Sequence, residues 1–294
     1  MGVLDEIQEE IRRVADQVSN TVVGIGQRWG LGSGVVIGKD QVLTNAHNVR
    51  ADEVSVTFHD GRTATGQVRG EDVDGDLAVI GVDTGESPVI EWATDGSPAV
   101  GTPVFALSNP GGRGLRVTLG FVTGLERSFR GPRGRRITGS IEHDAPLLPG
   151  SSGGPIVNAE GRLLGLNTNR LGEGFYLAIP ADETLKTRVD ALAGGESKGG
   201  IRLGIGVAPP HIARRMRRAV GLPDAEGLLV RHVEDNSPAS RAGLAEGDLI
   251  VQAAGRPVRG MDDLFEALAT ADDGIQLVIW RGTDERAVDV QLRT

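Results

Sequence analysis

The feature that most limits the fold is a series of short apolar runs, rich in β-branched residues and broken by Gly, Asp and Asn, that begins at residue 21. Almost no helical periodicity separates these runs up to residue 181. Many short strands joined by turns are typical of an antiparallel sandwich or barrel, and not of a fold in which strands alternate with helices. The runs lie at residues 21–25, 34–37, 54–58, 77–80, 104–107, 117–122, 155–157 and 163–166.

The segment before the first run has a different period. Five apolar residues follow one another there at steps of three and four, with acidic and basic residues between them. This spacing predicts an N-terminal amphipathic helix within residues 1–19. The five residues are Leu4, Ile7, Ile11, Val14 and Val18.

A change of composition near residue 194 predicts a domain boundary. The chain has 294 residues, close to twice the roughly 150 that are usual for one domain. A helical segment ends near residue 192, and the Gly-rich stretch 194–200 has the composition of a flexible linker. We therefore predict a strand-rich domain over residues 20–193 and a small α+β module over residues 201–294.

Charge and composition exclude several classes of function. With 31 Lys and Arg against 40 Asp and Glu, the net charge is −9, which argues against a nucleic-acid binder. The absence of cysteine excludes disulfides, thiolate metal sites and a cysteine nucleophile. No His-Glu-x-x-His motif is present, and the glycines at 30–34 lead into a strand and not into a helix, so we expect neither a metal nor a nucleotide cofactor.

A serine in a glycine-rich loop is the candidate nucleophile. Ser152 lies in the string Gly-Ser-Ser-Gly-Gly-Pro at 150–155, where the glycines let the backbone turn sharply and present its amides to a substrate carbonyl. The nucleophile elbow G-x-S-x-G also fits, but it requires a helix after the serine and an acid and a histidine downstream. The downstream histidines, His211 and His232, lie in the second module, and residues 155–164 predict a hairpin. The elbow is therefore excluded.

A histidine and an aspartate upstream complete the order His, Asp, Ser. His47 follows a buried-looking strand, and Asp76 begins the apolar run at 77–80. In this arrangement Ser152 attacks a peptide carbonyl, His47 transfers the proton to the leaving amine, and Asp76 orients and stabilises the imidazolium. A buried histidine and a strand-start aspartate are alternatives for each residue alone, but the ordered set favours the serine-protease interpretation.

At these residues the sequence resembles the HtrA/Deg family of trypsin-like serine proteases, and its second module resembles a PDZ domain. The resemblance covers essentially the whole chain after residue 20, with the motifs in family order. It implies a trypsin-like double six-stranded all-β barrel followed by a small α+β PDZ domain. The matching segments are Gly32–Ile37, Thr44–His47, Asp76–Ile80, Ser108–Gly112, Gly150–Pro155, Gly174–Pro180, Leu203–Ile205, Ser237–Leu244 and Gly247–Ile250.

Two residues near the predicted site depart from the family pattern. Ser151 stands where the family usually has Asn or Asp; because the oxyanion hole, predicted at Gly150, Ser151 and Ser152, uses backbone amides, we expect little effect. Asn48 stands where the family more often has an apolar residue, and a polar side chain there must find a partner. His143, on the strand that leads into the serine loop, is a candidate modulator.

The resemblance also suggests residues for substrate and peptide binding. In trypsin-like folds a carboxylate six residues before the serine selects basic side chains; here that residue is Pro146, so cleavage after Arg or Lys is not expected. We expect a pocket for small or medium apolar side chains, although Arg170 falls where an apolar wall is usual. The residues predicted to line this pocket are Pro146, Leu147, Leu166, Asn169 and Arg170. Those predicted to bind a peptide carboxylate through their amides are Leu203, Gly204 and Ile205.

The function implied by the resemblance is an ATP-independent serine endopeptidase that degrades unfolded or damaged proteins. Its expected partners are unfolded polypeptides, C-terminal peptides and further copies of the chain, as a trimer or higher oligomer. The alternative is a catalytically idle peptide-binding scaffold or chaperone. The sequence shows neither a signal peptide nor an apolar stretch of about 18 residues, so as it stands we expect a cytoplasmic protein without membrane insertion, whereas the resemblance suggests the periplasm or cell envelope.

Overall fold

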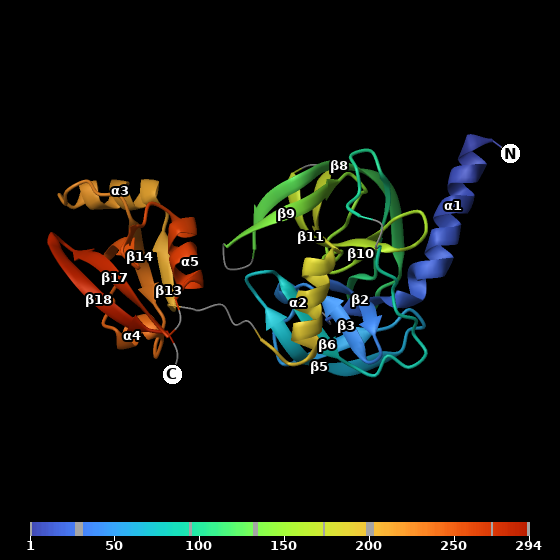
Figure 1. Cartoon of the computed structure of the whole chain (residues 1–294), viewed down its shortest axis with the longest axis horizontal. Helices are drawn as coiled ribbons and strands as arrows, with labels where there is room; N and C mark the ends of the chain where they lie inside the picture. The colour runs from blue at the N-terminus through green and yellow to red at the C-terminus, as the bar shows by residue number, and fades with distance from the viewer. Residues whose placement is uncertain are drawn as a thin grey trace. The chain divides into compact units, whose positions relative to one another are not determined.

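The short β-branched runs form two six-stranded antiparallel barrels in the computed structural model, which confirms the fold expected from the sequence (Figure 1). The chain divides into two units, residues 1–198 and 199–294, and each is described by itself. Residues 198–200 of the predicted linker lie outside the described residues. The structure describes residues 2–26, 32–93, 96–131, 135–172, 174–197, 203–271 and 273–292.

The first barrel has the strand order β1-β2-β3-β6-β5-β4 and closes because β1 also pairs with β4. Its strands are β1 (Val22–Ile25), β2 (Gly32–Gly38), β3 (Gln41–Thr44), β4 (Glu53–Thr57), β5 (Thr63–Asp72) and β6 (Leu77–Gly81). Because successive side chains on a strand point to opposite faces, each strand contributes to two clusters. Val36 and Ile80 belong to a cluster within this barrel, whereas Val35 and Val79 belong to a larger cluster that also contains residues of the second barrel.

The second barrel has the order β10-β11-β12-β9-β8-β7 and closes where β10 pairs with β7, with Ile156 opposite Ala106. Its strands are β7 (Pro103–Ser108), β8 (Arg116–Arg130), β9 (Arg136–His143), β10 (Pro155–Val157), β11 (Leu163–Gly172) and β12 (Phe175–Pro180). The pairing of β11 with β12 shifts register between Asn167 and Asn169, which indicates a β-bulge at this point. This bulge lies beside the loop that carries Ser152.

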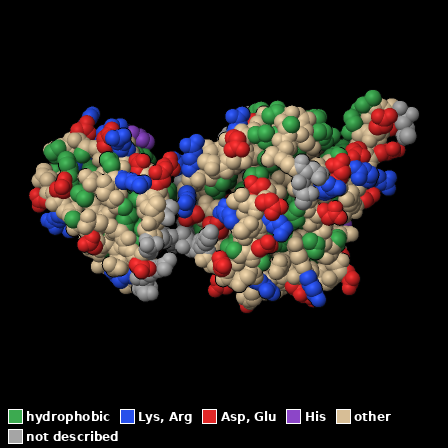
Figure 2. Space-filling view, viewed as in Figure 1, with side chains coloured by type: hydrophobic (Ala, Val, Ile, Leu, Met, Phe, Trp, Pro, Cys, Tyr) green, Lys and Arg blue, Asp and Glu red, His purple; other side chains and the backbone are tan. Residues whose placement is uncertain are grey.

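The N-terminal helix α1 (Val3–Val18) buries only part of its predicted apolar stripe. Val14 and Val18 are buried in the cluster shared by the two barrels, whereas Leu4 is 81% exposed and Ile7 is 40% exposed. Hydrophobic side chains gather near the free end of this helix (Figure 2). No helix among the described residues is long and apolar enough to cross a membrane.

The helix α2 (Glu183–Ala193) closes the first unit and packs against β5 and β6. Its first turn is capped by the side chain of Asp182, which accepts a hydrogen bond from the Leu185 amide at 2.8 Å. The helix places Leu185 and Val189 in the cluster shared by the two barrels. Helix α2 therefore holds the strands on either side of the turn that carries Asp76.

The second unit is a small α+β domain with the sheet order β13-β14-β15-β17-β18 and with β16 paired to β15. β13 stands at one edge of this sheet, and no described strand pairs with its outer side, so another strand could add there. The elements are β13 (Ile205–Ala208), α3 (Pro210–Ala219), β14 (Leu228–Val233), α4 (Pro238–Arg241), β15 (Leu249–Ala253), β16 (Arg256–Pro257), α5 (Met261–Ala269), β17 (Gly274–Arg281) and β18 (Asp284–Gln291).

Candidate active site

His47 and Asp76 meet at the end of the first barrel. His47 lies in the short 3₁₀ turn η2 (Ala46–Asn48) after β3, and Asp76 lies in the turn between β5 and β6. The His47 Nδ1 atom is 2.9 Å from both carboxylate oxygens of Asp76, and the His47 amide donates to Oδ1 at 3.1 Å. Asp76 is 1% exposed, and burying a carboxylate is costly unless its oxygens are hydrogen-bonded. The pair therefore fixes the ring of His47, and no described residue forms a hydrogen bond with its other nitrogen, Nε2.

The turn that carries Asp76 is held by two further carboxylates. The buried Asp72 forms an ion pair with Arg188 of helix α2, and Asp74 forms one with Arg135 at 3.1 Å. Asp76 itself has a φ of +56°, a conformation that is uncommon for residues other than glycine. The surrounding contacts therefore stabilise a backbone arrangement that Asp76 adopts at some cost.

Thr168 of β11 connects the first barrel with the serine, a role that no local sequence pattern indicates. Its hydroxyl donates to Asp76 Oδ2 at 2.6 Å, and its carbonyl accepts a hydrogen bond from Ser152 Oγ at 3.0 Å. Among the described residues no hydrogen bond joins Ser152 to His47. The Ser152 hydroxyl must therefore turn from the Thr168 carbonyl toward His47 before it can lose its proton. Such rearrangement is common, since catalytic hydrogen bonds often tighten only when substrate is bound.

The loop before Ser152 presents two amides without partners. Gly150 has a φ of +90°, and within the described part of the chain neither its amide nor that of Ser152 donates a hydrogen bond. The Ser151 amide, by contrast, donates to the Leu148 carbonyl at 3.1 Å, and its side chain is buried against Ser108. The prediction that Ser151 contributes to an oxyanion hole is therefore wrong for its amide, and Gly150 and Ser152 remain as the two candidate donors.

The predicted specificity residues do not all lie at an open surface. Pro146 and Arg170 are exposed and Leu147 is half-buried, but Leu166 is fully buried in the cluster shared by the two barrels. The prediction that Leu166 lines the pocket is therefore wrong, because an apolar strand residue suits a core as well as a pocket. The side chain of Asn169 lies outside what the structure describes, although its backbone pairs with Leu177.

Tyr176, whose role the sequence did not indicate, supports the segment with Leu147. The Tyr176 hydroxyl donates to the Leu147 carbonyl at 3.3 Å, and its ring stacks on His143 with centroids 5.8 Å apart. His143 is buried, and its Nε2 lies 2.9 Å from Asn167 Oδ1. Burial lowers the pKa of His143, because the charged imidazolium would lose its hydration. Burial therefore favours the uncharged form of His143, whose ring packs on Tyr176.

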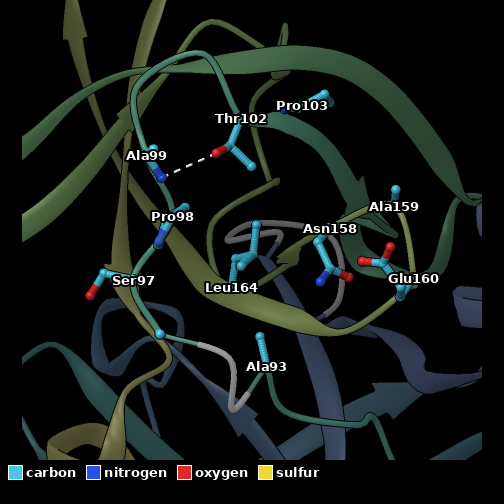
Figure 3. Close-up of a pocket in the computed structure, with 11 residues that line it drawn as sticks. Ala93, Ser97, Pro98, Ala99, Thr102, Pro103, Asn158, Ala159, Glu160 and Leu164 are labelled. Carbon is cyan, nitrogen blue, oxygen red and sulfur yellow. Dashed lines mark hydrogen bonds between the residues drawn. The ribbon is translucent and has the colours of Figure 1, made fainter.

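A separate pocket lies on the second barrel, between the segment before β7 and the β10–β11 turn (Figure 3). Ser97, Pro98 and Thr102 line one side and Asn158 and Glu160 the other. The Thr102 hydroxyl oxygen accepts a hydrogen bond from the Ala99 amide at 3.1 Å. Neither His47 nor Ser152 is among its lining residues, so this pocket is distinct from the candidate active site.

Elsewhere, no cluster of acidic and histidine side chains within the described ranges is arranged to hold a metal ion.

Comparisons with known proteins agree with this architecture. Residues 32–166 match the trypsin-like peptidase domain, and residues 229–281 match the PDZ domain. The barrels, the matched domains and the His–Asp–Ser arrangement define a trypsin-like serine peptidase joined to a PDZ domain. The chain is 36% identical over 282 residues to the putative serine protease HhoA of Synechocystis, covering 89% of this chain and 70% of that protein. It belongs to the HtrA/Deg family of serine endoproteases.

A further relative supports the same family, and solved structures share the fold. The serine endoprotease DegS of Salmonella typhimurium is 31% identical, over 89% of this chain and 76% of DegS. The pH-dependent serine endoprotease DegQ of Escherichia coli is 30% identical, but the chain spans only 60% of its length. The crystal structure of a serine endoprotease from Yersinia pestis superposes with a TM-score of 0.61 at 27% identity, covering 96% of this chain and 97% of that one. The HtrA-type protease AlgW with a decapeptide has the same fold, with a TM-score of 0.62 at 23% identity and coverage of 96% and 98%.

Proposed function

We propose that this chain is an active, ATP-independent endopeptidase that degrades unfolded or damaged polypeptides. The observation that carries the proposal is the linked set in which Thr168 contacts both Asp76 and Ser152 while Asp76 holds His47. Unfolded chains suit such a site because a serine protease cleaves an extended backbone, which a folded protein does not offer.

The chemistry follows from the positions of these groups. Ser152 Oγ attacks the peptide carbonyl carbon while His47 Nε2 takes its proton, and the new oxyanion is stabilised by the amides of Gly150 and Ser152. His47 then donates the proton to the leaving amine, and the C–N bond breaks to give an acyl-enzyme. A water molecule, deprotonated by His47, hydrolyses this ester and restores Ser152. Asp76 stabilises the imidazolium in both steps.

The second unit is proposed to bind C-terminal peptides. In the described part of the chain, the amides of Leu203 and Gly204 donate no hydrogen bond, and the outer edge of β13 is open. Gly204 has a φ of +75°, and a Cβ there would lie 2.2 Å from Ser237 Cβ, so the turn requires glycine. Free amides followed by an open strand edge suit a peptide that ends in a carboxylate and adds a strand. The AlgW structure with its decapeptide supports peptide binding in this family.

A catalytically idle scaffold is the competing function, and one experiment separates the two. Wild type, Ser152→Ala and the exposed control Ser97→Ala are incubated with a fluorophosphonate probe and with unfolded casein. The proposal expects labelling and cleavage by wild type and Ser97→Ala, and neither by Ser152→Ala. Wild type that neither reacts nor cleaves, or Ser152→Ala that behaves like wild type, would refute the protease function.

Self-association through α1 is a further part of the proposal. The exposed Leu4 and Ile7 extend the buried part of the same helix, and large apolar side chains exposed together suggest a contact surface. We propose a trimer or higher oligomer, which light scattering at micromolar concentration would detect. The double variant Leu4→Glu/Ile7→Glu is expected to dissociate it, with the exposed Glu9→Gln as the control. A wild-type chain that scatters as a monomer of 30.8 kDa would refute this part.

A further inference from the structure

The side chain of Asn48 contacts the nucleophile loop directly. Its amide nitrogen Nδ2 donates to the Ser152 carbonyl oxygen at 2.9 Å and lies 3.0 Å from Thr44 Oγ1, toward which it also donates. The same Ser152 carbonyl accepts a second hydrogen bond from the Ser33 amide at 2.8 Å. A carbonyl oxygen has two lone pairs, so these two donors satisfy it completely. One donor comes from β2 and the other from the residue next to His47.

These contacts form a closed ring of four residues. The Thr44 hydroxyl donates to the Ser33 carbonyl at 2.7 Å, and Ser33 in turn donates to Ser152. Thr44 and Ser33 are fully buried, so the ring is shielded from competing water on one side. Both protons of the Asn48 amide group are used within the ring. The planar amide therefore cannot shift at Thr44 without also shifting at Ser152.

The backbone around Asn48 leaves space for this amide. A Cβ at Gly32 would lie 2.4 Å from Asn48 Cγ, so a side chain at this position would displace the amide. A Cβ at Gly153, where φ is +85°, would lie 3.0 Å from Asn48 Nδ2 and only 2.1 Å from the Ser33 carbonyl. Gly32 and Gly153 therefore line the space that the Asn48 amide occupies between the histidine turn and the serine loop. An apolar side chain at position 48 could fill this space but could not donate to Ser152.

We propose that Asn48 is a positioning residue that ties the nucleophile loop to the histidine turn. With the carbonyl of Ser152 fixed from two sides, the serine needs only a side-chain rotation, away from Thr168 and toward His47, to become reactive. Asn48 also holds the backbone in the conformation in which the Gly150 and Ser152 amides stay free. This inference rests on the proposed proteolytic function, because it concerns the reactivity of Ser152.

Two substitutions separate positioning from simple packing. Asn48→Asp keeps the shape but loses the donor and sets a carboxylate oxygen against the Ser152 carbonyl oxygen. Asn48→Val is apolar and close in size, and only removes the donor. Asn20→Asp, an exposed residue of the first unit, is the control for the change in charge. The measurements are the second-order rate of reaction with a fluorophosphonate, kcat and KM for a chromogenic peptide per titrated active site, and thermal unfolding.

Loss of one hydrogen bond to the nucleophile loop is expected to lower the fluorophosphonate rate and kcat about tenfold in Asn48→Val, with KM within about twofold of wild type. Asn48→Asp is expected to lose more, and Asn20→Asp nothing. If Asn48→Val reacts with the fluorophosphonate and cleaves the peptide at wild-type rates per active site, the proposal is overturned, even if the melting temperature of this variant falls. If Asn48→Asp does not fold, Asn48→Val alone decides. A wild-type chain that does not react with the probe refutes the proposed function itself, which is a different result.

Discussion

Replacing Thr168 by valine removes the hydroxyl that donates to Asp76 at 2.6 Å and leaves the size of the side chain almost unchanged. Asp76 is 1% exposed, so water cannot easily replace the lost donor. Hydrogen bonds to charged groups contribute about 1.5–3 kcal/mol, and that range is the expected loss in the free energy of unfolding. For a domain of this size it corresponds to a fall of about 3–12 °C in melting temperature.

The same substitution is expected to lower kcat/KM about tenfold or more, because His47 is then the only hydrogen-bond donor to the Asp76 carboxylate among the described residues and the imidazolium is stabilised less well. Urea unfolding of the full chain and hydrolysis of a chromogenic peptide measure the two effects. Thr118→Val is the matched control, since the Thr118 hydroxyl makes only a 3.5 Å contact with the Ala106 carbonyl. If Thr168→Val loses no more stability than Thr118→Val and keeps its activity within twofold, the assigned role of Thr168 is wrong.

Three other predictions concern stability. Burial lowers the pKa of His143 in the folded chain. Between that lowered pKa and the ordinary value of about 6.5, the unfolded chain binds a proton more readily, so the free energy of unfolding falls as the pH falls. His143→Gln should reduce this loss of stability, measured by urea unfolding at pH 5 relative to pH 7.5. Gly153→Ala should prevent stable folding, seen by near-ultraviolet circular dichroism, because its Cβ would lie 2.1 Å from the Ser33 carbonyl; a wild-type spectrum would contradict this. Asp182→Ala should cost about 1 kcal/mol by loss of the α2 cap, and an unchanged urea midpoint would exclude that role.

The strands and the order of the candidate catalytic residues could be predicted because both depend on local signals. Each strand is indicated by a short apolar run and by the Gly-rich turns within a few positions of it, and the serine loop has a recognisable composition. The sequence also indicated that Asn48 needs a partner, since a polar side chain in that turn is costly without one. It could not identify the partner, because the Ser152 carbonyl lies 104 residues further along the chain.

The role of Thr168 and the burial of Leu166 could not be predicted for a related reason. Thr168 donates to a carboxylate 92 residues away, and no local pattern distinguishes it from other threonines on strands. Its position also depends on the register shift between Asn167 and Asn169, which only the pairing with β12 reveals. Leu166, two residues earlier, is buried in the shared cluster, where its apolar side chain serves packing and not substrate binding.

Because the site is divided between the two barrels, its activity depends on how the two barrels pack against each other. His47 and Asp76 belong to the first barrel and Ser152 and Thr168 to the second, and the 2.6 Å contact between Thr168 and Asp76 spans the junction. A small slide at the shared apolar cluster would separate proton acceptor from nucleophile while every strand stayed intact. A compound wedged into that cluster would therefore inhibit the enzyme without touching the four residues, and mild urea would abolish turnover before ellipticity changed.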